Sequence, residues 1–142
     1  MVGPHPEPVA SEASAMPPLF LTMLVGWCAL WALAIGIVLI GAVKREGGGL
    51  PPATAAFGAM TLFWIAIDLA IAGWAVLAPV TDVAEFRQLL LINGGLDVLY
   101  LATGAFLISR PKPILRGFGL AILVQGGFLL ILDLGWWWWL GP

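Results

Sequence analysis

The stretch 63–74, FWIAIDLAIAGW, decides the fold of the chain, because it is apolar on every side of a helix except for one aspartate, Asp68. A similar stretch at 128–139, FLLILDLGWWWW, again holds a single carboxylate, Asp133. A helix on the surface of a soluble protein keeps a polar face toward water, and neither stretch has one. Both therefore predict helices surrounded by lipid, each with a carboxylate inside its apolar run.

The composition of the whole chain supports the same conclusion. Its 142 residues are 61% hydrophobic and 10% charged, whereas soluble domains are about 45–50% apolar and about 25% charged. So few charged side chains cannot cover the surface of a soluble domain. The sequence predicts a multi-pass membrane protein.

Apolar runs long enough to cross a membrane, which takes about 20 helical residues, occur four times, at approximately 19–43, 53–80, 89–108 and 114–140. Short proline-containing loops separate them, and such loops join antiparallel neighbours. We therefore predict an all-α, antiparallel four-helix transmembrane bundle over residues 19–142. Residues 1–18 contain five prolines and no Lys or Arg, which is typical of an extended tail and not of a cleaved signal peptide.

The basic residues predict the orientation. Arg87 follows the second span, whereas the other five lie at the loops that join the first span to the second and the third to the fourth. Basic loops stay in the cytoplasm, so we expect a bacterial inner membrane protein with both termini, and the tail, on the non-cytoplasmic side. The five are Lys44, Arg45, Arg110, Lys112 and Arg116.

The two aspartate-containing stretches also suggest an internal repeat. A fainter match pairs ALAIGIVLI at 32–40 with YLATGAFLI at 100–108. A duplicated helical hairpin, its halves related by an axis along the membrane normal, explains both matches. Chance similarity between apolar segments explains them as well.

Polar side chains inside the spans form the candidate site. With the predicted orientation, the three aspartates lie between the midplane and the outer surface, where each costs up to about 2.5–3.5 kcal/mol on insertion. No Lys, Arg or His lies within the membrane core of any predicted span to offset them. The candidate polar or cation site consists of Asp68, Asn93, Asp97, Tyr100, Gln125 and Asp133.

Stripes of small or polar residues predict which helix faces pack together, because small side chains let another helix come close. We expect these stripes to face the bundle axis. They comprise Ala29, Ala32 and Gly36 in the first span, Trp64, Asp68, Ala72 and Ala75 in the second, and Gly119, Gly126 and Asp133 in the fourth.

Two interpretations of the carboxylates remain open. In one, they bind a proton, a metal cation or an organic cation, with nearby aromatic faces adding cation–π attraction. In the other, they are protonated or hydrogen-bonded and only fix the packing of the helices. The sequence leaves metal binding undecided.

The tryptophan run Trp136, Trp137, Trp138 and Trp139 ends the fourth span. Four consecutive side chains cover the whole circumference of a helix, so they cannot all face one pocket. Their position predicts an interfacial anchor in the headgroup region. Trp136 or Trp137, three and four residues after Asp133, can turn inward and donate a hydrogen bond to it.

The sequence lacks the residues that several kinds of chemistry require. His5, in the tail, is the one histidine, so no haem or chlorophyll ligated by a membrane histidine is expected. No nucleophile–base pair, phosphate loop or zinc-ligand spacing occurs, so we do not expect an enzyme. A nucleic-acid partner is not expected either.

Spans two to four resemble a family of small bacterial four-helix membrane proteins known only as a domain of unknown function. The resemblance covers about residues 55–135, including LLLINGGLDVLYLATGAFLI at 89–108, and implies the four-helix architecture but no activity. The tail and the tryptophan run lie outside it. It depends on Asp68, Asn93, Asp97, Gly117, Gly119, Gln125, Gly126 and Asp133.

Two hypotheses of function follow. The first is a non-catalytic membrane subunit or assembly factor that packs against lipid, other membrane subunits or a second copy of itself, or against an apolar cofactor such as a quinone or carotenoid. The second is a small proton- or cation-coupled transporter or sensor that uses the outer-half carboxylates.

Overall fold

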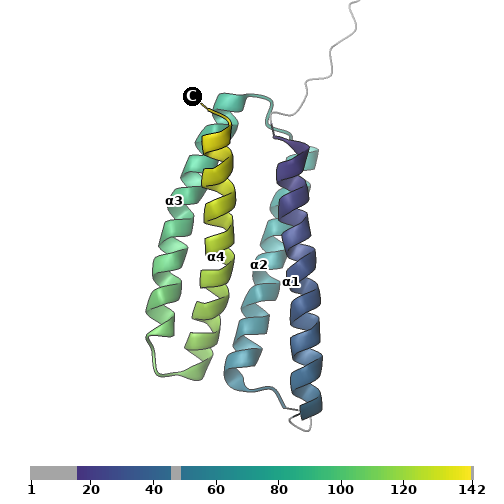
Figure 1. Ribbon diagram of the computed structural model, residues 1–142, viewed down its shortest axis with the longest axis vertical. Helices are drawn as coiled ribbons and strands as arrows, with labels where there is room; N and C mark the ends of the chain where they lie inside the picture. Colours follow the sequence, from purple (N-terminus) through teal and green to yellow (C-terminus); the bar gives the residue numbers. More distant parts are fainter. Residues whose placement is uncertain (1–15, 46–48, 142) are drawn as a thin grey trace, which may run out of the picture.

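The computed structural model describes residues 16–45 and 49–141, and within these ranges it contains four helices and no strands (Figure 1). Each helix is long and apolar enough to cross a membrane, so the predicted four-helix membrane fold is confirmed. Residues 1–15 of the predicted tail lie outside the described residues. The helices are α1 (Pro18–Arg45), α2 (Pro52–Leu77), α3 (Val83–Ile108) and α4 (Pro113–Trp139).

The helices run alternately up and down (Figure 1). We call the end where α1 begins and α4 ends the upper end, and the end where α1 and α3 end the lower end. The helices are 26 to 28 residues long, which corresponds to about 39–42 Å at 1.5 Å per residue. This exceeds the roughly 30 Å of a bilayer's hydrocarbon core.

Helix boundaries follow local chemistry. Pro52 and Pro113 open α2 and α4, where the missing proline N–H needs no partner. The Asp82 side chain caps α3 by accepting a hydrogen bond from the Ala84 backbone N–H at 2.8 Å. Consequently α3 begins at Val83, six residues before the apolar run at Leu89 that marked its predicted start.

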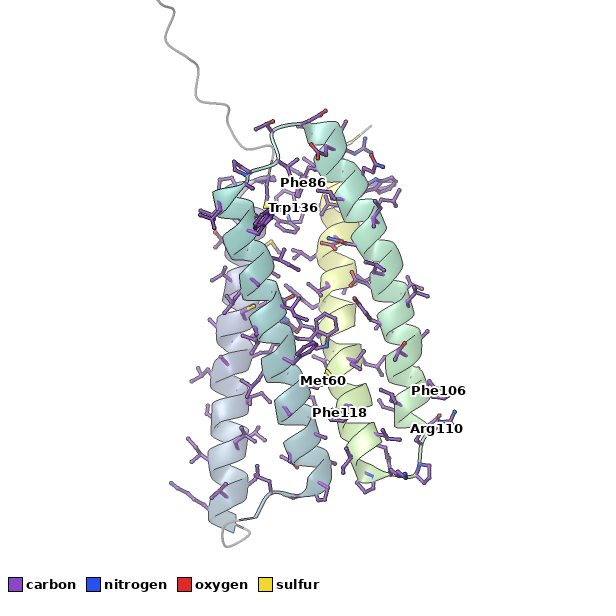
Figure 2. The ribbon with its side chains drawn as sticks, turned by 180° about the vertical axis from the view of Figure 1, so that it is seen from behind. Met60, Phe86, Phe106, Arg110, Phe118 and Trp136 are labelled. Carbon is purple, nitrogen blue, oxygen red and sulfur yellow. The ribbon has the colours of Figure 1, made fainter. Side chains whose placement is uncertain are left out.

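The arrangement of the helices departs from simple sequential packing. Helix α4 packs against both α3 and α2, and α1 packs against α2. In the described ranges no comparable interface joins α2 to α3, although a short loop connects them. Figure 2 views the bundle from the side on which α2 and α3 lie in front of α4 and α1.

Close approach of α3 and α4 depends on two glycines. A Cβ atom added at Gly119 would lie 2.7 Å from the Gly104 carbonyl oxygen, and one added at Gly104 would lie 3.0 Å from the Gly119 oxygen. Both residues are buried, as are Gly126 and Asp133. The stripe predicted for the fourth span therefore faces the bundle interior.

The stripe predicted for the first span was wrong. Ala29 and Ala32 are exposed, and the side chains of α1 that face the bundle are mostly large. Small residues are needed only where two backbones approach closely, and α1 instead reaches its neighbours through long side chains. Its buried residues are Phe20, Leu24, Cys28 and Ile35.

An aromatic cluster fills the bundle at its upper end. The ring of Phe20 on α1 meets Phe86 on α3 edge to face, with centroids 5.5 Å apart, and meets Trp136 on α4 at 6.2 Å. Phe86 and Trp136 lie near the same end in Figure 2. The cluster joins three helices.

Candidate functional site

A cavity of about 670 Å³ occupies the space that α2 and α3 leave between them. Helix α4 contributes to its wall, and residues at the start of α1 line its upper part. None of the described residues that line it is basic. Its acidic and aromatic lining residues are Asp68, Glu85, Asp97, Asp133, Phe20, Trp64, Trp74, Phe86 and Tyr100.

Asp68 has hydrogen-bond partners within the protein. The Gln125 amide on α4 donates a hydrogen bond to Asp68 Oδ2, and the Cys28 thiol on α1 lies 3.9 Å from the same oxygen. Trp27 Nε1 in turn donates to Gln125 Oε1 at 2.8 Å. This network joins α1, α2 and α4, and it supports the structural interpretation for Asp68.

Asp97 differs from Asp68 because it has no such partner. It is 3% exposed, and its Oδ2 has no hydrogen-bond partner in the described part of the chain. It is the fifteenth of the 26 residues of α3, so it lies deeper than a span beginning at Leu89 had predicted. A buried carboxylate oxygen without a donor is unfavourable, and it marks a position where a ligand can supply one.

Asp133 is the second carboxylate without a protein donor among the described side chains. It is 5% exposed and lines the cavity. The three aspartates are nevertheless spread along the cavity, and no group of three His, Cys, Asp or Glu side chains in the described residues is placed to hold one metal ion.

The aromatic part of the site lies on α2 and α3. The rings of Trp64 and Tyr100 meet edge to face with centroids 4.9 Å apart. Trp64 is buried, and its Nε1 has no hydrogen-bond partner within the described ranges. Tyr100 is half-buried and Asn93 is exposed, but both line the cavity.

The structure thus brings five of the six predicted site residues to one cavity, and the sixth, Gln125, lies behind Asp68. Sequence reasoning missed Trp27 as the donor to Gln125 and Cys28 as a neighbour of Asp68. The sequence did offer a signal, because Trp27 and Cys28 are adjacent in the first span and each carries a hydrogen that can be donated. It was not decisive, because the rotation of α1 was predicted incorrectly.

The tryptophans of the run differ in exposure, because consecutive residues of a helix point in different directions. Trp136 is buried at 9% exposure, whereas Trp138 is 81% and Trp139 70% exposed. Trp136 turns inward but packs on Phe20 and Trp139, and no described hydrogen bond joins it to Asp133. Trp137 lies beneath Arg87, whose guanidinium carbon is 5.4 Å from the indole centroid.

These features define a four-helix membrane protein with an acidic, aromatic cavity between its second and third helices. The chain belongs to DUF6992, a family of unknown function, whose model matches residues 23–134. This confirms the resemblance to a family of unknown function and extends it to α1, while Trp136–Trp139 lie beyond the match. No curated protein and no solved structure matches the chain.

Proposed function

We propose that this protein is a non-catalytic, multi-pass protein of the bacterial inner membrane that binds a lipid-like molecule in the cavity between α2 and α3. The observation that carries the proposal is the cavity itself. Its size suits a small-molecule ligand, because ligand sites commonly measure about 300–1,000 Å³ and combine apolar walls with a few polar groups.

The edges of the cavity support entry from the bilayer. Ile71 and Trp74 on α2 are 52% and 70% exposed, and Leu96 on α3 is 43% exposed. All three also line the cavity. Because these apolar side chains belong both to the cavity and to the lipid-facing surface, a molecule dissolved in the membrane can pass between α2 and α3 without crossing water.

The same proposal includes a role in a larger membrane assembly. The described helices expose apolar side chains on most of their outer faces, which suits contact with lipid or with other membrane subunits. None of the described side chains that line the cavity is a histidine or a serine.

Photolabelling tests ligand binding. The purified protein is placed in phosphatidylcholine nanodiscs with a long-chain alcohol that carries a diazirine in its chain, and the labelled residues are mapped by mass spectrometry. We expect labelling of Trp74 and Leu96 that saturates and that excess unlabelled alcohol prevents. Leu33, which is exposed on α1 away from the cavity, serves as the control for unspecific contact with lipid.

A matched pair of variants checks the position of the ligand. Ala75→Phe fills space in the cavity wall, whereas Ala70→Phe adds the same ring on an exposed part of α2 outside it. The first substitution should abolish saturable labelling and the second should preserve it. Equal, unsaturable labelling of Leu33 and Leu96 in the unaltered protein would contradict the proposal.

Transport coupled to a proton or cation is the second candidate function, and Asp97 is the observation that favours it. A buried carboxylate near the middle of a membrane helix, with no protein donor, is typical of ion pathways. Proteoliposome flux assays test this candidate. Flux that is present in the parent and lost in Asp97→Asn supports it, and absence of flux in the parent removes it.

A further inference from the structure

The three buried aspartates of the cavity differ in their hydrogen-bond partners. Of the three buried aspartates, Asp68 receives hydrogen bonds from Gln125 and Cys28. Asp97 Oδ2 has no hydrogen-bond partner among the described residues, and Asp97 is 3% exposed as a whole residue. No described hydrogen bond reaches Asp133, which is 5% exposed. Two carboxylates in the cavity wall are therefore left for a donor that comes from outside the chain.

The charge balance restricts that donor further. No basic side chain is present among the described residues that line the cavity. Away from water, an anionic carboxylate is stabilised by a cation held against it, and an ammonium group supplies both a positive charge and several N–H donors. A phosphate headgroup would be repelled by the same carboxylates, so an ordinary phospholipid is a poor match.

Aromatic rings stand beside the carboxylates. Trp64 and Tyr100 meet at 4.9 Å on the cavity wall, and Tyr100 follows Asp97 by one helical turn on α3. Indole and phenol faces attract ammonium groups through the ring quadrupole. Metal binding is a weaker match, because no three ligating side chains in the described residues gather at one point.

We propose that the cavity takes an amphiphile with an ammonium headgroup and no phosphate. The ammonium group contacts Asp97 and Asp133, and the hydrocarbon chain leaves between the apolar edges of α2 and α3. This inference rests on the proposed function, that the cavity holds a lipid-like ligand, and adds the class of its headgroup.

The test compares two photoreactive probes that share one diazirine-bearing hexadecyl chain, one ending in a primary ammonium group and the other in a hydroxyl group. Labelling of cavity residues is measured in phosphatidylcholine nanodiscs over a range of probe concentrations. The ammonium probe should half-saturate at a concentration at least about tenfold lower, as expected for a charge-assisted hydrogen bond to a buried carboxylate.

Two isosteric variants locate the preference. Asp97→Asn should raise the half-saturating concentration of the ammonium probe by about tenfold and leave that of the hydroxyl probe unchanged. Asp82→Asn is the control, because Asp82 is exposed, does not line the cavity and only caps α3, a role that asparagine keeps. It should leave both values unchanged. Asp133→Asn should act in the same direction as Asp97→Asn, and it replaces that variant if Asp97→Asn does not fold.

The outcomes separate the two proposals. Saturable labelling by both probes at equal concentrations overturns the ammonium inference and leaves the proposed function standing. Absence of saturable labelling by either probe overturns both. An ammonium preference that survives in Asp97→Asn and Asp133→Asn also overturns the inference, because the charge would then be recognised elsewhere.

Discussion

Gln125 on α4 donates a hydrogen bond to Asp68 on α2 and accepts one from Trp27 on α1, so that a single amide joins three helices. Within a membrane such bonds contribute modestly one by one, about 0.6 kcal/mol on average. Removing the amide, however, leaves a buried acceptor and a buried donor without partners at the same time. The penalty should therefore exceed that of losing one ordinary interhelical bond.

We expect Gln125→Leu to lower the free energy of unfolding by about 1–3 kcal/mol, measured by circular dichroism during titration of micelles with a denaturing detergent. Thr103→Val is the control, because the exposed Thr103 hydroxyl bonds only to a carbonyl of its own helix. Adding Asp68→Leu to Gln125→Leu should recover part of the loss. A loss no larger than that of Thr103→Val would contradict a stabilising role for the network.

The contact between α3 and α4 at Gly119 gives a second prediction. A methyl group there would lie 2.7 Å from the Gly104 oxygen and 2.8 Å from the Ile108 nitrogen, both backbone atoms that cannot move alone. Gly119→Ala should therefore destabilise the bundle by about 1–3 kcal/mol. Gly127→Ala adds the same methyl group on the same helix at a position where nothing lies within 4 Å. The free energy of unfolding of this variant should change by less than about 1 kcal/mol. Equal effects would indicate that the helices separate easily at Gly119.

The number, type and direction of the helices could be predicted from the sequence because length and apolarity alone determine them. The rotation of each helix about its axis could not. A helix that is apolar on all sides carries no periodic signal to show which side faces a neighbour. Ala29 and Ala32 were placed inward for this reason, although the buried face of α1 contains Phe20 and Cys28 instead.

The candidate site was predictable in its residues but not in its shape. Intramembrane aspartates stand out in any apolar run, and Asp97 and Tyr100, three residues apart in the sequence, share one face of a helix. The cavity exists because α2 and α3 are neighbours in sequence but lack an interface in the described structure. The short loop between α2 and α3 predicts that these helices are neighbours. No local sequence pattern indicates that α4 packs against both of them and separates them.

The tryptophan run gives a third prediction, since its members have different surroundings. Trp136→Ala removes a buried ring that contacts Phe20 and Trp139, and it should lower the free energy of unfolding by about 3 kcal/mol. Trp138→Ala removes a ring that is 81% exposed and should change it by less than about 0.5 kcal/mol. Denaturing-detergent titration in micelles compares the two. A larger effect of Trp138→Ala would show that the ring is covered by something outside the chain.

The orientation in the membrane gives the last prediction. Basic residues gather at the lower end, where Arg110 lies beyond the end of α3 (Figure 2), and basic loops remain in the cytoplasm. Ser109→Cys at the lower end and Thr81→Cys at the upper end place a thiol at exposed positions and keep every basic residue. In intact spheroplasts, a membrane-impermeant maleimide should label Thr81→Cys at once and Ser109→Cys only after lysis. The parent is the control and should stay unlabelled, because Cys28 is buried. The reverse pattern would place both termini in the cytoplasm, and the cavity would then lie in the inner half of the membrane.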